Sequence, residues 1–186
     1  FAPLRIDAEA AQATCDAVNS LITPGASFMY EDNRLDVPTD ALGSWVSSYI
    51  ADLPEGGYRL DPYLDDSKAT PALVGLMNED ARGSAVAVSF AKQGDQITVT
   101  PHGEITIPQL DEAIADLDAR MFDGYRTTGT YQAAPTYDPI DIKVRLYDGT
   151  LSFDEALSYG VIGEVSSFTT QYTSTSSTQN RNHNIH

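Results

Sequence analysis

Hydrophobic and polar residues follow their clearest pattern between residues 94 and 121. Polar and apolar residues alternate along 96–100, which predicts a half-buried strand. Thr106 can cap a following helix, and Gln109 would complete a capping box. Beyond this start, apolar residues recur at helical spacing, namely Leu110, Ile114, Leu117 and Met121. We therefore expect a strand that leads into a helix with one buried face.

The first sixty residues contain two further helical patterns around a predicted hairpin. Asp7 caps a first helix that ends near Ile22, ahead of a Pro-Gly pair. Two short strands follow at 27–30 and 34–37, and a short extended piece is expected at 58–60. Between the strands and this piece, a second helix is predicted from apolar residues at helical spacing, namely Leu42, Trp45, Val46, Tyr49 and Ile50.

The next seventy residues show a similar order of predicted elements. Asp61 starts a helical stretch, residues 84–91 pair with 96–100 as a hairpin, and 127–132 is predicted as a strand. The segments 7–60 and 61–132 thus share the order helix, hairpin, helix, strand. An internal duplication is therefore a hypothesis, although no residue-level repeat accompanies it.

The remaining residues complete an α+β prediction. Alternation over 140–146 predicts a strand, and Ser152 with Glu155 forms a capping box for a short helix. We expect small, mainly antiparallel or mixed sheets, with amphipathic helices packed on one face of each. The expected core comprises Trp45, Phe90, Val99, Leu110, Ile114, Leu117, Ile142 and Val144.

Composition narrows the classes of partner. The chain of 186 residues has a formal net charge of −16, so nucleic acids and anionic membrane surfaces are unfavourable partners. No apolar run reaches the roughly 18 residues that a membrane-spanning helix requires. The single cysteine, Cys15, excludes an intrachain disulfide, and its place on an apolar stripe predicts a small buried side chain. We expect a monomer.

Candidate catalytic chemistry is sparse. The three histidines, His102, His183 and His186, lack ligand spacing for zinc, and the familiar nucleophile and phosphate-loop motifs do not occur. Carboxylates are abundant, and a pair such as Asp138 and Asp141 would need a cleft and a raised pKa to act as acid and base. We expect no metal ion and no cofactor.

Tyrosines are the candidate ligand-binding residues. Aromatic faces beside acids and amides bind sugars through stacking and hydrogen bonds. Tyrosine is also common as a half-buried strand residue, so a structural role remains the alternative. The tyrosines proposed to contact a ligand are Tyr125, Tyr131, Tyr137 and Tyr147.

The C-terminal segment carries a family resemblance. Residues 166–172, with the sequence Ser-Phe-Thr-Thr-Gln-Tyr after Ser166, precede a polar gap and the motif Arg181-Asn182-His183-Asn184-Ile185. The two motifs in this order resemble the opening of a VanW-like domain, a family associated with vancomycin resistance. The polar segment 162–186 would be the start of such a domain, whose body lies beyond His186.

Residues 1–161 resemble the peptidoglycan-binding domain that precedes VanW-like domains, chiefly through the strand 94–101 and the Leu110-Asp111 helix start. The junction at His102-Gly103-Glu104 departs from that pattern. The resemblance implies an extracellular protein of the cell envelope, tethered by a membrane segment outside this chain, with peptidoglycan as partner. It supplies no catalytic residues, so we expect a non-catalytic wall-binding or positioning module. The alternatives are a structural spacer or protein-interaction domain, and a carboxylate-dependent glycan hydrolase.

Overall fold

The computed structural model of the chain describes residues 6–80, 87–131, 136–159 and 161–162. These residues form an α+β fold, as the alternation of hairpin and helix patterns predicts. The described helices are α1 (Ala8–Ile22), α2 (Thr39–Trp45), α3 (Asp66–Asp80), α4 (Leu110–Thr128) and α5 (Phe153–Ser158). The described strands are β1 (Ala26–Tyr30), β2 (Asn33–Val37), β3 (Val46–Asp52), β4 (Tyr58–Leu64), β5 (Val88–Gln93), β6 (Gln96–Pro101), β7 (Ile105–Pro108), β8 (Ile140–Asp141), β9 (Val144–Tyr147) and β10 (Leu151–Ser152).

Four small sheets are built mainly from antiparallel hairpins. β1–β2 and β5–β6 confirm the two predicted hairpins, and each gains a third strand from the C-terminal part of the chain. β8 joins β1 in parallel, whereas β10 joins β6 antiparallel. β3–β4 and β7–β9 are two-stranded. The third strands attach to different members of the two hairpins, and β7 precedes α4 without a counterpart before α2, which argues against the duplication hypothesis.

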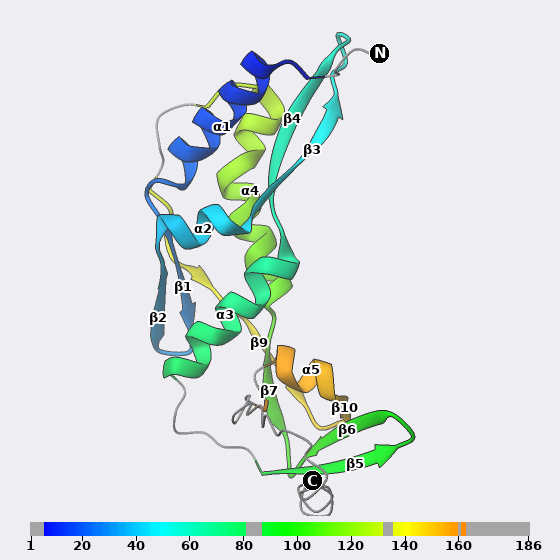
Figure 1. Ribbon diagram of the computed structural model, residues 1–186. Coiled ribbons are helices and arrows are strands. Elements are labelled where there is room, and N and C mark those ends of the chain that lie inside the picture. Colours follow the sequence, from blue (N-terminus) through cyan, green and yellow to red (C-terminus); the bar gives the residue numbers. More distant parts are fainter. Residues whose placement is uncertain (1–5, 81–86, 132–135, 160, 163–186) are drawn as a thin grey trace, which may run out of the picture.

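The larger core surrounds α4. This helix packs on α3 and on β4, and β4 also contacts α1 (Figure 1). The core combines side chains from α1, β1, β2, α2, β4, α3, α4 and β8. Its largest fully buried members are Trp45, Phe28, Phe122, Leu42, Leu73, Ile114, Leu117 and Met121. Because about 25 cal/mol is gained per Å² of apolar surface removed from water, this core is the main source of stability.

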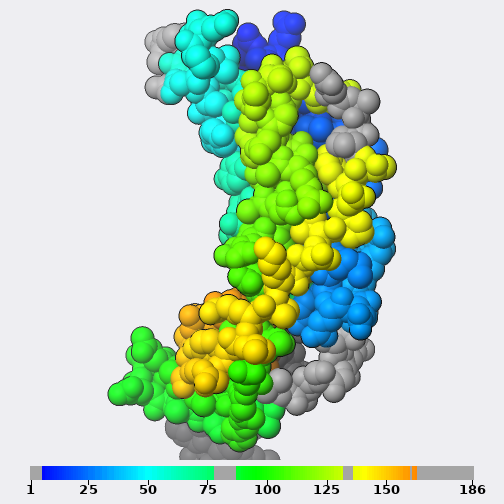
Figure 2. Space-filling view, turned by 180° about the vertical axis from the view of Figure 1, so that it is seen from behind, coloured from blue at the N-terminus to red at the C-terminus, as the bar shows by residue number. Residues whose placement is uncertain are grey.

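A smaller core lies at the other end of the molecule. It contains Val99, Ile105, Ile107, Leu151 and Ala156, and α5 covers one side of it. The chain passes between the two cores three times, from α3 to β5, from β7 to α4 and from β8 to β9. The start of α1 and the whole of α5 lie near opposite ends of the body (Figure 1). Figure 2 shows a crescent whose tips are the β3–β4 and β5–β6 hairpins.

The predicted second helix is wrong beyond its first two turns. α2 ends at Trp45, and residues 46–52 form β3, which pairs with β4 over seven residues. The β-branched and aromatic side chains of Val46, Tyr49 and Ile50 favour a strand once a partner is present. The helix predicted from Asp61 is also wrong at its start, because residues 61–64 belong to β4. Pro62 is tolerated there because β4 has a strand partner on one side only.

Other boundaries differ for identifiable reasons. Residues 105–108 form β7, so α4 begins at Leu110 and the predicted Thr106 capping box does not form. α4 continues to Thr128 and ends at left-handed Gly129, which replaces the strand predicted at 127–132. The strand predicted at 140–146 is divided into β8 and β9, which join different sheets. The Ser152 capping box of α5 is confirmed.

Three predicted core residues are exposed. Phe90 is 58% exposed because the β5–β6 hairpin extends beyond the cover of α5, and Val144 is 42% exposed on the outer side of β9. Cys15 is exposed as well, because α1 buries Thr14, Ala17, Leu21 and Ile22 instead. The other predicted core residues are buried. The tail motifs after residue 162 lie outside the described residues.

Candidate functional site

Tyr125 belongs to the core and offers no face to a ligand. Its side chain is 5% exposed, its hydroxyl lies 2.9 Å from Thr14 Oγ1, and the Arg59 guanidinium lies 5.6 Å from its ring centre. The prediction that Tyr125 contacts a ligand is therefore corrected. Its place on α4, four residues after Met121, follows from the same helical stripe that forms the core.

The other predicted tyrosines lie on three different parts of the fold. Tyr131 is 44% exposed after the end of α4. Tyr147 is half-buried on β9, where its hydroxyl donates to the Thr150 carbonyl at 3.0 Å and Arg145 covers its ring. Tyr137 packs against the larger core just before β8. The four tyrosines therefore do not form one aromatic platform.

Tyr137 lines a pocket beside the start of β1 and the end of β2. Its hydroxyl donates a hydrogen bond of 2.9 Å to the Leu21 carbonyl, and burial raises its pKa to about 12. We call this cavity of about 490 Å³ the sheet-face pocket. It is lined by Pro24, Gly25, Ala26, Ser27, Arg34, Asp36, Val37, Pro38, Thr39, Thr136 and Tyr137.

The register of the β1–β2 hairpin explains the polar lining of this pocket. Phe28 and Leu35 are directly opposed and point into the core. Because side chains alternate along a strand, Ser27, Asp36 and Arg34 lie on the opposite face. Figure 2 shows the yellow segment around β8 beside the blue segment of the β1–β2 hairpin.

Charge in the sheet-face pocket comes from one ion pair. Arg34 Nε donates to Asp36 Oδ1 at 2.8 Å, and both side chains are largely exposed. Such an exposed pair contributes about 0–1 kcal/mol to stability. No other lining residue carries a formal charge at neutral pH. Sequence reasoning overlooked Ser27, Arg34 and Asp36, although the predicted hairpin alternation already placed them on one face.

A second pocket of about 370 Å³ lies between the two cores, at the start of α4. Its lining combines Arg145 with Asp111 and with the polar side chains of α5 and α3. Tyr159 lines it, but none of the four proposed tyrosines does. Within the described residues, no side chain bonds the first turn of α4 as a cap. The nearby acids oppose the use of this helix start for an anion.

Among the described residues, one carboxyl group has a raised pKa. Burial is the main cause at Asp66, followed by the charges of Asp111, Asp118 and Asp65. Asp66 lines neither of the two pockets described above. The Asp118 carboxylate has a structural role, because it accepts hydrogen bonds from Leu64 N at 2.7 Å and from Arg126. Across the described ranges, no three side chains of metal-ligating type cluster around a common point.

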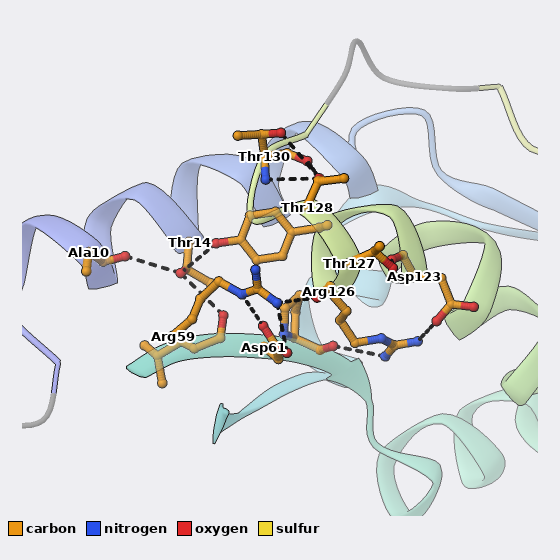
Figure 3. A network of polar contacts seen from close by, with 12 residues as sticks. Ala10, Thr14, Arg59, Asp61, Asp123, Arg126, Thr127, Thr128 and Thr130 are labelled. Atoms are coloured by element: carbon orange, nitrogen blue, oxygen red, sulfur yellow. Dashed lines mark hydrogen bonds and ion pairs between the residues drawn. The ribbon is translucent and has the colours of Figure 1, made fainter. Parts of the chain in front are cut away.

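The densest polar network is structural (Figure 3). Arg59 of β4 donates to Asp61 at 2.6 Å and to the main-chain carbonyl of Arg126 on α4. Arg126 returns a hydrogen bond to the Pro62 carbonyl at 3.1 Å and pairs with Asp118 and Asp123. Burial disfavours the charged Arg126 guanidinium, but these carboxylates outweigh it and raise its pKa. The network fastens β4 to α4.

No family model, curated protein or solved structure matches this chain. In the part of the chain that the structure describes, no helix combines the length and the apolar character needed to cross a membrane. The sheet-face pocket is therefore the strongest candidate site on structural grounds. It includes one of the tyrosines predicted from the sequence, Tyr137.

Proposed function

We propose that this protein is a non-catalytic, extracytoplasmic module that binds cell-wall peptidoglycan or positions a neighbouring domain on it. The observation that carries the proposal is the sheet-face pocket, which joins the ring of Tyr137 to polar groups of the β1–β2 hairpin. Its volume falls within the range of about 300–1,000 Å³ typical of sites for small ligands. The resemblance of 166–185 to the opening of a VanW-like domain supports the wall as the source of the ligand.

The absence of long-range attraction limits the expected affinity. The protein carries a net charge of −16, and the wall is also anionic, so binding must come from stacking and hydrogen bonds at short range. We expect dissociation constants in the high micromolar range or weaker. Added salt should therefore not reduce retention, because screening removes repulsion between two anions rather than attraction.

A pull-down on purified sacculi tests the proposal. We expect the protein to be retained at physiological salt above a control protein of similar size and acidity. Retention should decrease when Tyr137 is replaced by Ala and the folded fraction is confirmed by circular dichroism, whereas Tyr131→Ala should leave retention unchanged. Retention equal to that of the acidic control would overturn wall binding.

A structural spacer is the second candidate, and the crescent shape favours it. The start of α1 and the end of the described chain lie toward opposite tips, and α4 runs through the larger core between them. A spacer would keep its shape and show no retention on sacculi. A carboxylate-dependent hydrolase is less favoured, because Asp66, the acid whose pKa is raised, is outside both pockets described here.

A further inference from the structure

Ser27 is a buried residue whose hydroxyl has no hydrogen-bond partner among the described residues. It is 5% exposed, and none of the described residues bonds its Oγ atom. Among the described side chains, every polar atom sealed from solvent has a partner. The Ser27 hydroxyl is therefore not sealed, and the surface that it retains opens into the sheet-face pocket that it lines. An unpaired hydroxyl at the floor of a pocket is a preformed hydrogen-bonding group for a ligand.

Arg34 has unused donors on the same face. Its Nε atom is held by Asp36 at 2.8 Å, and its two terminal nitrogens bond none of the described residues. Asp36 therefore orients the guanidinium group and leaves its outer edge free. That edge is the one that binds a carboxylate through two parallel hydrogen bonds.

The hairpin register places these two donors close together. Ser27 is directly opposite Asp36, so Ser27 and Arg34 are diagonal neighbours across the two strands. Diagonal neighbours are about 7–8 Å apart between Cα atoms, a gap that an arginine side chain can bridge. The ring of Tyr137 forms an adjacent wall. The pocket thus presents a hydroxyl, a guanidinium edge and an aromatic surface to one small ligand.

From this arrangement we infer that the sheet-face pocket binds the carboxylate group of a small polar ligand, with Arg34 and Ser27 as hydrogen-bond donors and Tyr137 as a packing surface. The inference rests on the proposed function and specifies its ligand class as a carboxylate-bearing unit of the wall. Two sources share this chemistry, the carboxyl end of a stem peptide and the acid group of a lactyl-bearing amino sugar. Uncharged parts of the glycan would bind more weakly, because they leave the guanidinium edge unpaired.

Amide chemical shifts during titration of the 186-residue chain test the inference, using two matched pairs of probes. The first pair is N-acetyl-D-alanyl-D-alanine and its C-terminal carboxamide. The second pair is N-acetylmuramic acid and N-acetylglucosamine. We expect at least one acid to shift the amides of Ser27, Arg34 and Asp36, and its neutral counterpart to bind about tenfold more weakly or worse. The acid that binds identifies the source.

Two substitutions assign the contacts. Arg34→Gln should weaken acid binding about tenfold, and Ser27→Ala should weaken it about threefold, since one neutral donor is lost. Arg145→Gln is the matched control, because it removes the same charge from the second pocket and should leave affinity unchanged. Each variant is first checked for a native spectrum.

Three results would overturn the inference: no pocket shifts with either acid at millimolar concentration, equal affinity for acids and neutral counterparts, or an equal loss in Arg34→Gln and Arg145→Gln. Sacculus retention separates this failure from failure of the proposed function. If the Arg34→Gln variant is still retained on sacculi and no acid binds to the pocket, the pocket assignment is wrong and wall binding stands. If the pocket binds an acid through Arg34 but the protein is not retained on sacculi, the pocket assignment stands and the wall is not the target of the protein.

Discussion

Tyr137 joins the larger core to the sheet-face pocket through a single side chain. Its ring packs on the core, its hydroxyl donates to the Leu21 carbonyl, and burial keeps that hydroxyl protonated up to a pKa of about 12. An unfolded tyrosine ionises near pH 10. The stabilising effect of the protonated phenol is therefore complete below pH 10 and is lost as pH rises toward 12.

Substitution of Tyr137 by Phe tests this coupling. At pH 7 the variant should be less stable by about 1 kcal/mol, the net value of one hydrogen bond. The difference from wild type should shrink between pH 10 and pH 12, because only the wild-type chain loses the proton. Urea unfolding at several pH values measures both effects. Tyr131→Phe serves as the control, since Tyr131 is 44% exposed, and a pH-independent difference for Tyr137→Phe would contradict the argument.

At the same scale, sequence patterns identify buried residues well where one helix face is involved. Leu110, Ile114 and Leu117 lie on the buried stripe of α4, as their spacing predicts. Phe90 shows the limit of such reasoning. Its side chain faces the same way as buried Val99, its cross-strand partner, but the covering helix does not extend over it. Alternation defines the face of a strand, whereas burial depends on which distant element covers that face.

At the scale of elements, local pattern and tertiary pairing compete. Residues 46–52 have apolar residues at helical spacing and also the composition of a strand. Pairing with β4 decides the outcome, because seven opposed residues join β3 to β4, and the Arg59 network holds β4 against α4. A sequence window restricted to residues 46–52 contains neither β4 nor α4. The hairpins at β1–β2 and β5–β6 were predictable because a two-residue turn joins their strands, whereas five residues separate β3 from β4.

Two glycines, one after α4 and one inside α3, offer substitutions with opposite expected effects on stability. Gly129 has φ of +70°, and an added Cβ would approach Arg59 Nη1 to 2.8 Å. Gly129→Ala should therefore lower the unfolding free energy by about 1–2 kcal/mol, from left-handed strain and displacement of Arg59. Gly75→Ala lies inside α3 with open space around the new methyl group and should add about 0.5–1 kcal/mol. Thermal unfolding of both variants checks the signs, and equal signs would contradict the assigned roles.

For the whole molecule, the two separate cores predict unequal local stability. The larger core contains 22 buried residues among those described, whereas the smaller core contains five. Regions with fewer buried apolar contacts open at lower free energy. The division into two cores was not predictable from sequence, because β9 and β10 join the smaller unit from a segment distant in the chain.

Native-state hydrogen exchange tests this division. Amides of α4 and β4 should be better protected than those of the β5–β6 hairpin. Leu151→Ala, at a site 2% exposed in the smaller core, should remove about 2–5 kcal/mol of protection from β6, β10 and α5. The middle of α4 should keep its protection. A uniform loss across both cores would show that they open as one unit, and Leu146→Ala, at an exposed site on β9, is the control.

The three chain passages between the cores have a mechanical consequence. A load applied between the start of α1 and the end of α5 must cross the junction of the two cores, here called the waist, where β7 leads into α4. Besides packing, the waist is braced by the hydrogen bond from Gln109 N to Lys143 O at 2.8 Å. Under traction the waist would yield before either core unravels. The protein would then lengthen in steps, as a compliant link rather than as a stiff rod.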